Sequence, residues 1–534
     1  MKNKVLTNSL LWAWLVLCIG AIFTHSSSFT DFYILPKWLV VIALVLCLGA
    51  YGTMRLIINK PVRIDFPALG IGMSVLCCIQ AIYGLLQYFS LVHSDFGYKI
   101  TGTFDNPAGF AACLCCGLPF VAFFLLHHNR YMRYAGWAIS ALIIVAVYLS
   151  HSRSGIVSVL VIIIVYVCGK YIHGRVTKPL LAVVLAGLVV ASCYWIKKDS
   201  ADGRLLIWQC GWEMVKDAPF FGHGIGSFDA HYMDYQADYF KEQGLENRYA
   251  MLADNVKQPF NEYLGVLINW GIAGLLLLVG IVGVLVYCYR QNPTMEKRIA
   301  LYALLSIGVF SCFSYPFTYP FTWLVTFLAV LMLTSDYWNK IKIPVWCRNI
   351  IYMAAMLGAF IGMNKVRDRF QMERNWQEAS VLALCNDYDE AIVYYVTLLH
   401  KFEDNPYFLY NYAAVLVENK QYEKSLKIAL QCRQYWADYD LELIIGENYQ
   451  YLGKQELAQM YYKNASMMCP SRFLPLYKLF HLYKENKEHD KMREIAELII
   501  RKPMKIKTSS ILMMKREMKR ELRKLEERIF DENL

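Results

Sequence analysis

Charged residues are scarce in this 534-residue sequence, at 18%, whereas hydrophobic residues make up 57%. That balance excludes an ordinary soluble globular protein and indicates structure embedded in a bilayer. The sixteen cysteines lie mostly inside apolar runs and lack the spacing of a metal site or a disulfide framework. Rossmann and Walker glycine spacings are also lacking. The net charge of +11 is scattered over short loops and the C-terminal tail, which argues against a nucleic-acid partner.

Apolar stretches long enough to cross about 30 Å of hydrocarbon recur along the first two thirds of the chain. Each is expected to be a helix, because an open sheet cannot satisfy its backbone in lipid. The first stretch lacks a small-residue cleavage site, so we interpret it as a retained span rather than a signal peptide. About eleven spans are predicted, near residues 9–24, 38–58, 66–90, 108–126, 134–150, 154–172, 178–196, 262–288, 298–313, 318–335 and 345–363.

Basic residues orient these spans. Lys2 and Lys4 precede the first span, and alternate loops are basic while the intervening loops show no such excess. The positive-inside rule therefore predicts a cytoplasmic N-terminus. The polar stretch at residues 197–261 is here named the polar loop. Because the number of spans is odd, the polar loop and the C-terminal third are expected outside. In a Gram-negative cell that location would be the periplasm. The basic residues of the alternate loops are Arg55, Lys60, Arg63, Arg130, Arg133, Lys170, Arg175, Lys178, Arg290, Lys297, Arg298, Lys340, Lys342 and Arg348.

From about residue 364 the sequence becomes polar and tyrosine-rich, with a period near 34. A recurrent block begins at Asn386, Lys420 and Gly453, and more faintly at Lys487. Paired helices with a small residue at their crossing are typical of tetratricopeptide repeats, which generally dock proteins or peptides. Three to four repeats and a protein partner are therefore predicted, with a plain helical domain as the alternative.

The chain is thus predicted to be all-α. Residues 1–363 are expected to form a polytopic membrane bundle with the polar loop outside, and residues 364–503 an α-solenoid. Residues 504–534, with Lys, Arg and Glu at helical spacing, predict a charged, solvated capping helix rather than a helix on the membrane surface.

Two arginines on the predicted outer face suit a phosphate-bearing ligand. Arg153 lies in SHSRSGI directly before an apolar run, where Ser152 and Ser154 offer hydrogen bonds. An arginine at this position can also merely snorkel to the bilayer interface. Arg204, in DGRLLIW, lies just beyond the next outward crossing. Together the two guanidinium groups can bind a pyrophosphate and stabilise its departure.

The run PFFGHGIGSF contains three glycines, Gly222, Gly224 and Gly226. They can cradle a polyanion, but a glycine-rich stretch with no preceding strand can equally be a tight turn against the bilayer. Both interpretations are open at this point.

The run QPFNEYL leads into the eighth predicted span and contains Asn261, a candidate for substrate binding, and Glu262. Glu262 can accept a proton, or it can be an N-terminal acid that the helix dipole favours.

In their order and topology these motifs resemble the Wzy_C superfamily, which comprises O-antigen ligases, O-antigen polymerases and protein O-oligosaccharyltransferases. The resemblance extends from about residue 101 to residue 316. It rests on GTFDNPAGFA, SRSG, DGRLLIW, DAPFFGHGIGSF, FNEYLGVLINWGIAG and SYPF.

The resemblance implies transfer of a glycan from a polyprenyl-diphosphate carrier to an acceptor outside the cytoplasmic membrane, with no nucleotide, metal or other cofactor. Arg153 and Arg204 match the family's donor-diphosphate arginines. The acceptor is a lipid A core in a ligase, a growing glycan in a polymerase, and a Ser or Thr side chain in an oligosaccharyltransferase. The family commonly has a histidine where this chain has Phe260, so Glu262 and His223 are the remaining candidates for the base.

Two other classes of function are compatible with a polytopic chain of this kind. In a polysaccharide exporter the arginines would only bind anions, but charged residues deep in the spans and an inverted repeat are lacking. In a non-catalytic scaffold the repeats would recruit partners and the arginines would be dispensable.

Overall fold

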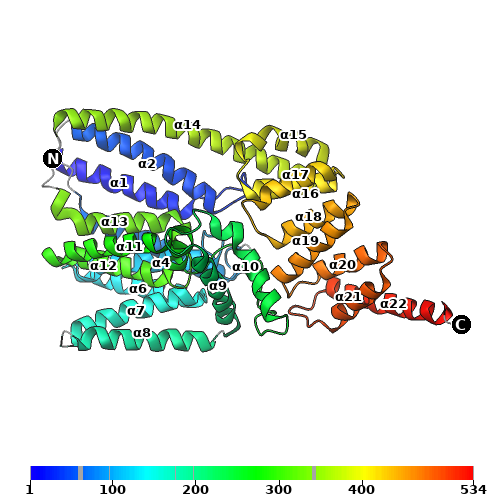
Figure 1. Cartoon of the computed structure of the whole chain (residues 1–534). Coiled ribbons are helices and arrows are strands. Elements are labelled where there is room, and N and C mark those ends of the chain that lie inside the picture. Colours follow the sequence, from blue (N-terminus) through cyan, green and yellow to red (C-terminus); the bar gives the residue numbers. More distant parts are fainter. Residues whose placement is uncertain are drawn as a thin grey trace. The chain divides into compact units, whose positions relative to one another are not determined.

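The computed structural model describes residues 2–57, 64–94, 97–172, 174, 176–196, 198–338 and 344–532. The regular structure in these ranges is helical and includes no strand, which confirms the predicted all-α fold (Figure 1). Several residues invoked above lie outside the described residues, namely Lys60, Arg63, Arg175, Lys197, Lys340, Lys342 and residues 533–534.

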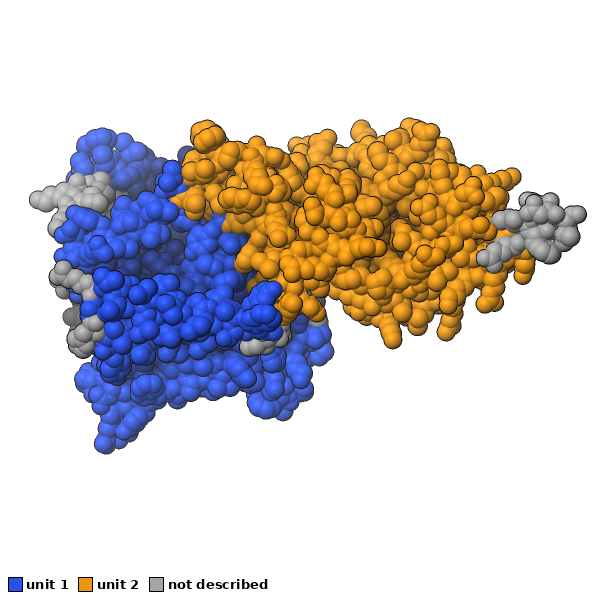
Figure 2. Space-filling view, turned by 60° about the horizontal axis from the view of Figure 1, so that its bottom comes forward, with its two compact units in different colours: residues 1–196, 260–263, 276–377 blue, residues 197–259, 264–275, 378–534 orange. Residues whose placement is uncertain are grey.

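The chain forms two compact units (Figure 2). Unit 1 consists of Met1–Ile196, Phe260–Tyr263 and Leu276–Gln377, and unit 2 of Lys197–Pro259, Leu264–Leu275 and Glu378–Leu534. Because the units are packed bodies rather than stretches of sequence, helix α11 contributes to both. The predicted domain boundaries after residues 363 and 503 therefore stay predictions.

Unit 1 is a bundle of apolar helices. All eleven predicted spans fall on helices, and eight of the described helices are long and apolar enough to cross a membrane. The predicted multi-pass membrane bundle is thereby confirmed, although α1, α8 and α12 do not meet the same criteria within the described residues. The helices are α1 (Lys2–Phe23), α2 (Ile34–Ile57), α3 (Phe66–Tyr88), α4 (Pro107–Gly117), η2 (Leu118–Val121), α5 (Ala122–Leu125), α6 (Arg130–Leu149), α7 (Arg153–Tyr171), α8 (Thr177–Ile196), part of α11 (Glu262–Gln291), α12 (Met295–Ser311), η3 (Pro316–Thr318), α13 (Pro320–Trp338) and most of α14 (Val345–Leu384).

Helix α4 lies at the core of unit 1, with every residue from Gly109 to Gly117 buried. Ser306 of α12 donates a hydrogen bond to the carbonyl oxygen of Cys115 at 2.8 Å, and Ser158 of α7 donates to the carbonyl oxygen of Ser306 at 3.0 Å. A Cβ on Gly155 of α7 would lie 3.0 Å from the Cβ of Ala111. Small residues and interhelical hydrogen bonds are what bring helices together where no water is expelled.

Unit 2 combines the polar loop with the C-terminal third. Its helices are α9 (Lys198–Asp217), α10 (Ser227–Gln243), the Leu264–Leu275 part of α11, α15 (Tyr388–Leu398), η4 (Leu399–Lys401), α16 (Pro406–Glu418), α17 (Tyr422–Arg433), α18 (Tyr439–Tyr451), α19 (Gln455–Met468), α20 (Leu474–Glu485), α21 (His489–Arg501) and α22 (Ser509–Glu532), together with the end of α14.

The same turn joins the two helices of each pair four times over. Asn386, Lys420, Gly453 and Lys487 all have left-handed φ values, between +58° and +74°. In each turn the following residue donates its N–H to a carbonyl five residues earlier, as Gln421 does to Leu416 at 2.8 Å. This is the Schellman arrangement that ends a helix. Its recurrence at the predicted period confirms the helical repeats.

Helix α22 packs against the last of these pairs. Met518 and Leu525 are buried, and Glu521 forms an ion pair with Lys484 of α20 at 2.7 Å. The charged C-terminal segment therefore covers the end of the solenoid, as a capping helix does.

Candidate functional site

The N-terminus of α7 carries three of the predicted site residues. Ser152 caps the helix, because its Oγ accepts a hydrogen bond from the N–H of Gly155 at 3.4 Å. Ser154 Oγ donates to the carbonyl oxygen of Phe313 at 3.1 Å. Arg153 is the first helical residue and is half-buried. Its charge is thus added to the helix end that already carries the positive end of the dipole.

The start of α11 carries Asn261 and Glu262. Asn261 Oδ1 accepts a hydrogen bond from the N–H of Tyr263 at 3.0 Å, and Glu262 Oε1 accepts one from the N–H of Phe317 at 3.1 Å. Each contact gives a backbone N–H group a hydrogen-bond acceptor and so stabilises the local structure. The substrate-binding role of Asn261 and the proton-accepting role of Glu262 stay predictions.

Phe260, at the position where the resembling family has histidine, directly precedes this helix. Its φ is +51°, a left-handed value that is unusual for an aromatic residue. Its ring meets the ring of Tyr315 edge-on, with 5.3 Å between the centroids. Phe260 therefore packs the site and supplies no proton acceptor.

A third helix start, that of α4, lies in the same site. Sequence reasoning missed its residues as functional candidates, although they lie within the motif GTFDNPAGFA. Asn106 Oδ1 caps α4 by accepting from the N–H of Gly109 at 2.9 Å, and its Nδ2 donates to Tyr319 Oη at 3.0 Å. Tyr319 Oη donates to Asp105 Oδ1 at 2.9 Å. Burial raises the pKa of Asp105, although hydrogen bonds from Tyr319 and Asn106 act to lower it.

The segment from Phe313 to Tyr319 joins these three helix starts. It bonds to Ser154 of α7, to Glu262 of α11 and to Asn106 of α4. Three helix N-termini, one of which begins with Arg153, therefore meet around one short segment of unit 1. The partial charges of the helix ends are positive and favour an anion, whereas the carboxyl groups of Asp105 and Glu262 lie in the same cluster.

Arg204 lies in unit 2, on helix α9, and is half-buried. One turn further on, Trp208 Nε1 donates to the carbonyl oxygen of Pro259 at 3.1 Å, which ties α9 to the end of the polar loop. Arg153 belongs to unit 1. The predicted pairing of the two arginines on one diphosphate therefore stays a prediction.

The glycine-rich turn fills a break in helix α11 by pairing with the backbone groups there. Gly271 interrupts the helix with φ +60° and ψ −159°, which leaves backbone groups on both sides without helical partners. The turn replaces those partners with four backbone hydrogen bonds. These are His223 N–H to Ile268 O at 2.8 Å, Gly224 N–H to Asn269 O at 3.0 Å, Ile272 N–H to Pro219 O at 2.8 Å and Ala273 N–H to Phe220 O at 3.1 Å.

This docking accounts for two of the glycines. A Cβ on Gly222, whose φ is +68°, would lie 2.5 Å from the carbonyl carbon of Asn269. A Cβ on Gly271 would lie 2.4 Å from the carbonyl carbon of Phe220. Gly224 and Gly226 have open space around them but positive φ values of +97° and +81°. The turn interpretation thus has a physical basis, and phosphate binding by these glycines stays a prediction.

His223 is held within the same turn. Its Nε2 lies 2.7 Å from the carbonyl oxygen of Met214, which can only accept, so Nε2 carries the proton. The ring centroid lies 6.4 Å from that of His231 on α10. His223 therefore ties the turn to α9, and its role as a base would require the other ring nitrogen.

One carboxylate of the polar loop is poorly solvated. Asp229, in the first turn of α10, has a buried Oδ1 that makes no hydrogen bond to any described residue. Burial raises the pKa of Asp229 to about 6, while the charge of Lys257 acts to lower it. Lys257 itself lies over the rings of Tyr407 and Trp436, with Nζ 4.8 Å from each centroid.

A metal site is not evident in the part of the chain that the structure describes, where no three His, Cys, Asp or Glu side chains are grouped to hold an ion. The expectation of a reaction without metal or cofactor stays a prediction.

The apolar helices of unit 1 and the four helix pairs from α14 to α21 define the class of protein. It is a multi-pass membrane protein that carries a solenoid of the tetratricopeptide kind. Residues 138–279 match the model of the O-antigen ligase family, Wzy_C. The resemblance predicted from the motifs is thereby confirmed for these residues.

The other comparisons add little. No curated protein matches the sequence. The crystal structure of yeast Tom70 matches with 10% sequence identity and a TM-score of 0.26, over 90% of this chain and 96% of that chain. A similarity at that TM-score carries no argument about either fold or function.

Substitution of the turn glycines tests the docking into the helix break. Gly222→Ala and Gly224→Ala should both destabilise the protein, because alanine costs about 1–2 kcal/mol at a positive φ. Gly222→Ala should cost clearly more, because its Cβ also meets the backbone of α11. Thermal unfolding of the two detergent-solubilised variants makes the comparison. Equal losses would contradict the docking.

Asp229→Asn should stabilise the protein at pH 7.5. The pKa of Asp229 is raised from 3.8 to about 6 in the folded state, so the folded protein binds the proton more tightly than the unfolded chain. Stability contributed by this group is present below pH 4 and is lost as the pH rises through 6, by on the order of 2–3 kcal/mol.

The gain in unfolding temperature from Asp229→Asn should therefore shrink as the pH is lowered from 7.5 to 4.5. Asp238→Asn, an exposed change in the same helix, serves as the control. A gain in unfolding temperature that does not depend on pH would show that burial does not raise the pKa of Asp229.

Proposed function

We propose that this protein transfers a glycan from a polyprenyl-diphosphate carrier to an acceptor at the outer face of the membrane, as an O-antigen ligase-like enzyme. The observation that carries the proposal is the meeting of the N-termini of α4, α7 and α11 around the segment from Phe313 to Tyr319, with Arg153 at one of them. A diphosphate is the ligand that this electrostatic environment favours.

The donor diphosphate is assigned to Arg153 and the start of α7, with Arg204 of the polar loop as a second ligand. Guanidinium groups bind phosphate oxygens through paired hydrogen bonds, and fixed positive charge stabilises the diphosphate as negative charge develops on it. Ser152 and Ser154 keep the helix end in position through their bonds to Gly155 and Phe313. The polyprenyl chain would remain among the apolar helices.

In the reaction an acceptor hydroxyl oxygen forms a bond to the anomeric carbon of the glycan. The bond between that carbon and the diphosphate oxygen breaks, and the diphosphate leaves with the electron pair. The hydroxyl proton passes to a base or to the departing phosphate. Since diphosphate is a good leaving group, charge stabilisation by the arginines is expected to supply much of the catalysis.

Three groups are candidates for the base. Glu262 uses Oε1 to accept from the N–H of Phe317, and His223 uses Nε2 to bond the carbonyl oxygen of Met214. Asp105, whose pKa burial raises, is a stronger base than an ordinary carboxylate. It lies beside Tyr319 in the same cluster of helix starts, so it joins the two candidates from the sequence.

The acceptor decides the particular activity. A lipid A core is proposed first, with a growing glycan or a protein side chain as alternatives within the same superfamily. The repeat domain favours a protein partner or acceptor, because helical repeats bind proteins and peptides. The proposed location is the inner membrane, with the N-terminus in the cytoplasm and the repeat domain in the periplasm.

Removal of the arginines tests the donor site. Arg153→Ala and Arg204→Ala should each lower the rate of transfer by the purified protein about 100-fold or more, as loss of a charge-stabilising donor does elsewhere. Arg153→Lys should retain part of the rate, because it keeps the charge but loses the paired hydrogen bonds. Transfer from a polyprenyl-diphosphate-glycan donor is the measurement.

Arg367→Ala is the matched control, since Arg367 is exposed and pairs only with the neighbouring Asp368 among the contacts described. Wild-type rates for Arg153→Ala and Arg204→Ala would contradict the donor-site assignment. If the alanine variants were active in cells while deletion of the repeats was not, the scaffold alternative would replace the enzyme.

Deletion of the gene identifies the acceptor. Cells without the protein should accumulate polyprenyl-linked glycan and lose glycan from lipopolysaccharide, because the donor is still made but not used. Lipid extracts, lipopolysaccharide and glycoproteins of the deletion strain are compared with the parent. Intact lipopolysaccharide with loss of protein-linked glycan would rule out the ligase and support the oligosaccharyltransferase.

A further inference from the structure

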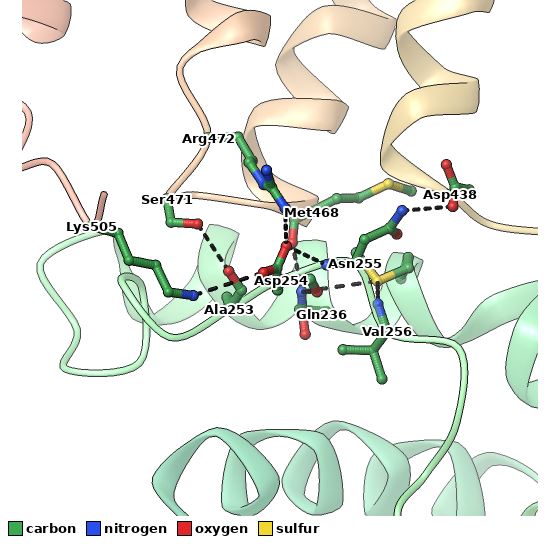
Figure 3. Close-up of polar contacts among 11 residues, drawn as sticks. Gln236, Ala253, Asp254, Asn255, Val256, Asp438, Met468, Ser471, Arg472 and Lys505 are labelled. Atoms are coloured by element: carbon green, nitrogen blue, oxygen red, sulfur yellow. Dashed lines mark hydrogen bonds and ion pairs between the residues drawn. The ribbon is translucent and has the colours of Figure 1, made fainter. Parts of the chain in front are cut away.

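One edge of the solenoid is occupied by the protein's own polar loop. The segment from Ala253 to Val256 runs past the connections that follow α17, α19 and α21 (Figure 3). Lys257 comes next and lies over the rings of Tyr407 and Trp436. The connections that it meets are residues 434–438, 469–473 and 502–508.

Each connection supplies a contact. Asn255 Nδ2 donates to Asp438 Oδ2 at 2.7 Å, in the first connection. In the second, Arg472 forms an ion pair with Asp254 at 2.7 Å. In the third, Lys505 Nζ lies 3.8 Å from the same carboxylate. The three connections follow one another at the period of the repeats. The extended segment therefore meets a polar side chain from each of them.

Helix α10 deepens this contact. Gln236 is fully buried, and its Nε2 donates to the carbonyl oxygens of Met468 at 2.6 Å and Asp254 at 3.1 Å. Asp234 pairs with Arg433, at the end of α17. A buried amide with both partners in place specifies one arrangement, because any other leaves polar groups unsatisfied.

The Asp254 carboxylate is held in its charged form. Burial acts to raise the pKa of Asp254, but the hydrogen bonds from Arg472 and the N–H of Asn255 and the charge of Lys505 outweigh it, and the pKa is lowered. Two cations from two different connections thus converge on one acidic residue of the loop.

These contacts lead to Arg204. The clamped segment ends at Lys257, and two residues later the carbonyl oxygen of Pro259 accepts from Trp208 Nε1 at 3.1 Å. Trp208 lies one helical turn after Arg204 on α9. The path from the solenoid to the arginine therefore runs through one short, hydrogen-bonded strap.

We infer that the repeat domain is an internal clamp for the catalytic loop, in which Asp254, Arg472 and Gln236 are positioning residues that fix Arg204 through the Ala253–Pro259 strap. The catalytic part of this inference rests on the proposed function, whereas the clamp itself does not.

Charge reversal across the ion pair tests the clamp in the full-length protein. Arg472→Asp places two carboxylates together, so the strap should detach. Hydrogen exchange of residues 250–259 should become at least about 10-fold faster, and transfer from the polyprenyl-diphosphate donor should fall about 10- to 100-fold. The fall should be in kcat, because misplacement of Arg204 weakens stabilisation of the leaving diphosphate.

The double variant Asp254→Arg with Arg472→Asp should recover much of both properties, which a variant that merely misfolds would not do. The matched control is Glu447→Lys, which breaks the 2.9 Å ion pair with Lys478 inside the repeats. It should leave both exchange in the strap and transfer unchanged.

Unchanged exchange in Arg472→Asp would overturn the clamp, and so would failure of the double variant to restore it. Faster exchange with unchanged transfer would overturn the positioning of Arg204. If the wild-type protein transferred no glycan at all, the proposed function would fail, while the exchange measurement would still decide whether the solenoid holds the loop.

Discussion

The backbone of a membrane helix must pair its own N–H and C=O groups, and the structure around the candidate site depends on how α11 meets that constraint after breaking at Gly271. The residues from Pro219 to Gly224 supply the missing donors and acceptors, so the broken helix and the polar loop are parts of one hydrogen-bonded construction. Broken helices with a second segment in the gap occur at the binding sites of other membrane proteins. Here the gap explains why the loop cannot be a freely mobile appendage.

The polar loop is therefore fixed at two places along its length. Near its middle, the turn at Gly222 is docked into α11, and near its end, Asp254 is held by the connections between repeats. Helix α9, with Arg204, lies before the first place and is bonded to the second through Trp208 and Pro259. Preorganisation of this kind lowers the cost of orienting a charged group when a ligand binds.

Much of the architecture could be predicted from the sequence, because its signals are local. Apolar length alone marks a helix that can span a bilayer, and all eleven predicted ranges fall on helices. The repeats were recognisable because one turn recurs at Asn386, Lys420 and the two later positions. The sequence analysis did not predict the capping contacts of Ser152 and Asn261, although both have side chains that helix starts prefer.

The remaining features depend on residues far apart in the chain. Asp105 and Tyr319 are separated by 214 positions, and a hydrogen bond between them leaves no period or spacing in a single sequence. The break at Gly271 looks like ordinary span sequence, because what makes it possible is a partner segment some fifty residues earlier. The same holds for Asp254 and Arg472, since each alone resembles a solvated surface charge.

The clamp also sets an order of events during synthesis. The bond between Ala253 and Ser471 spans 218 residues, and the bond from Gln236 to Met468 spans 232. At a usual translation rate the loop waits roughly ten to forty seconds before its partners exist. During that interval Gln236 lacks its Met468 partner, and α10 can pack against α9 but not yet against α19. The polar loop therefore reaches its final arrangement only after the repeats are made. A ribosome that stops before the third repeat releases a polar loop that can dock into α11 but is not held by the repeats.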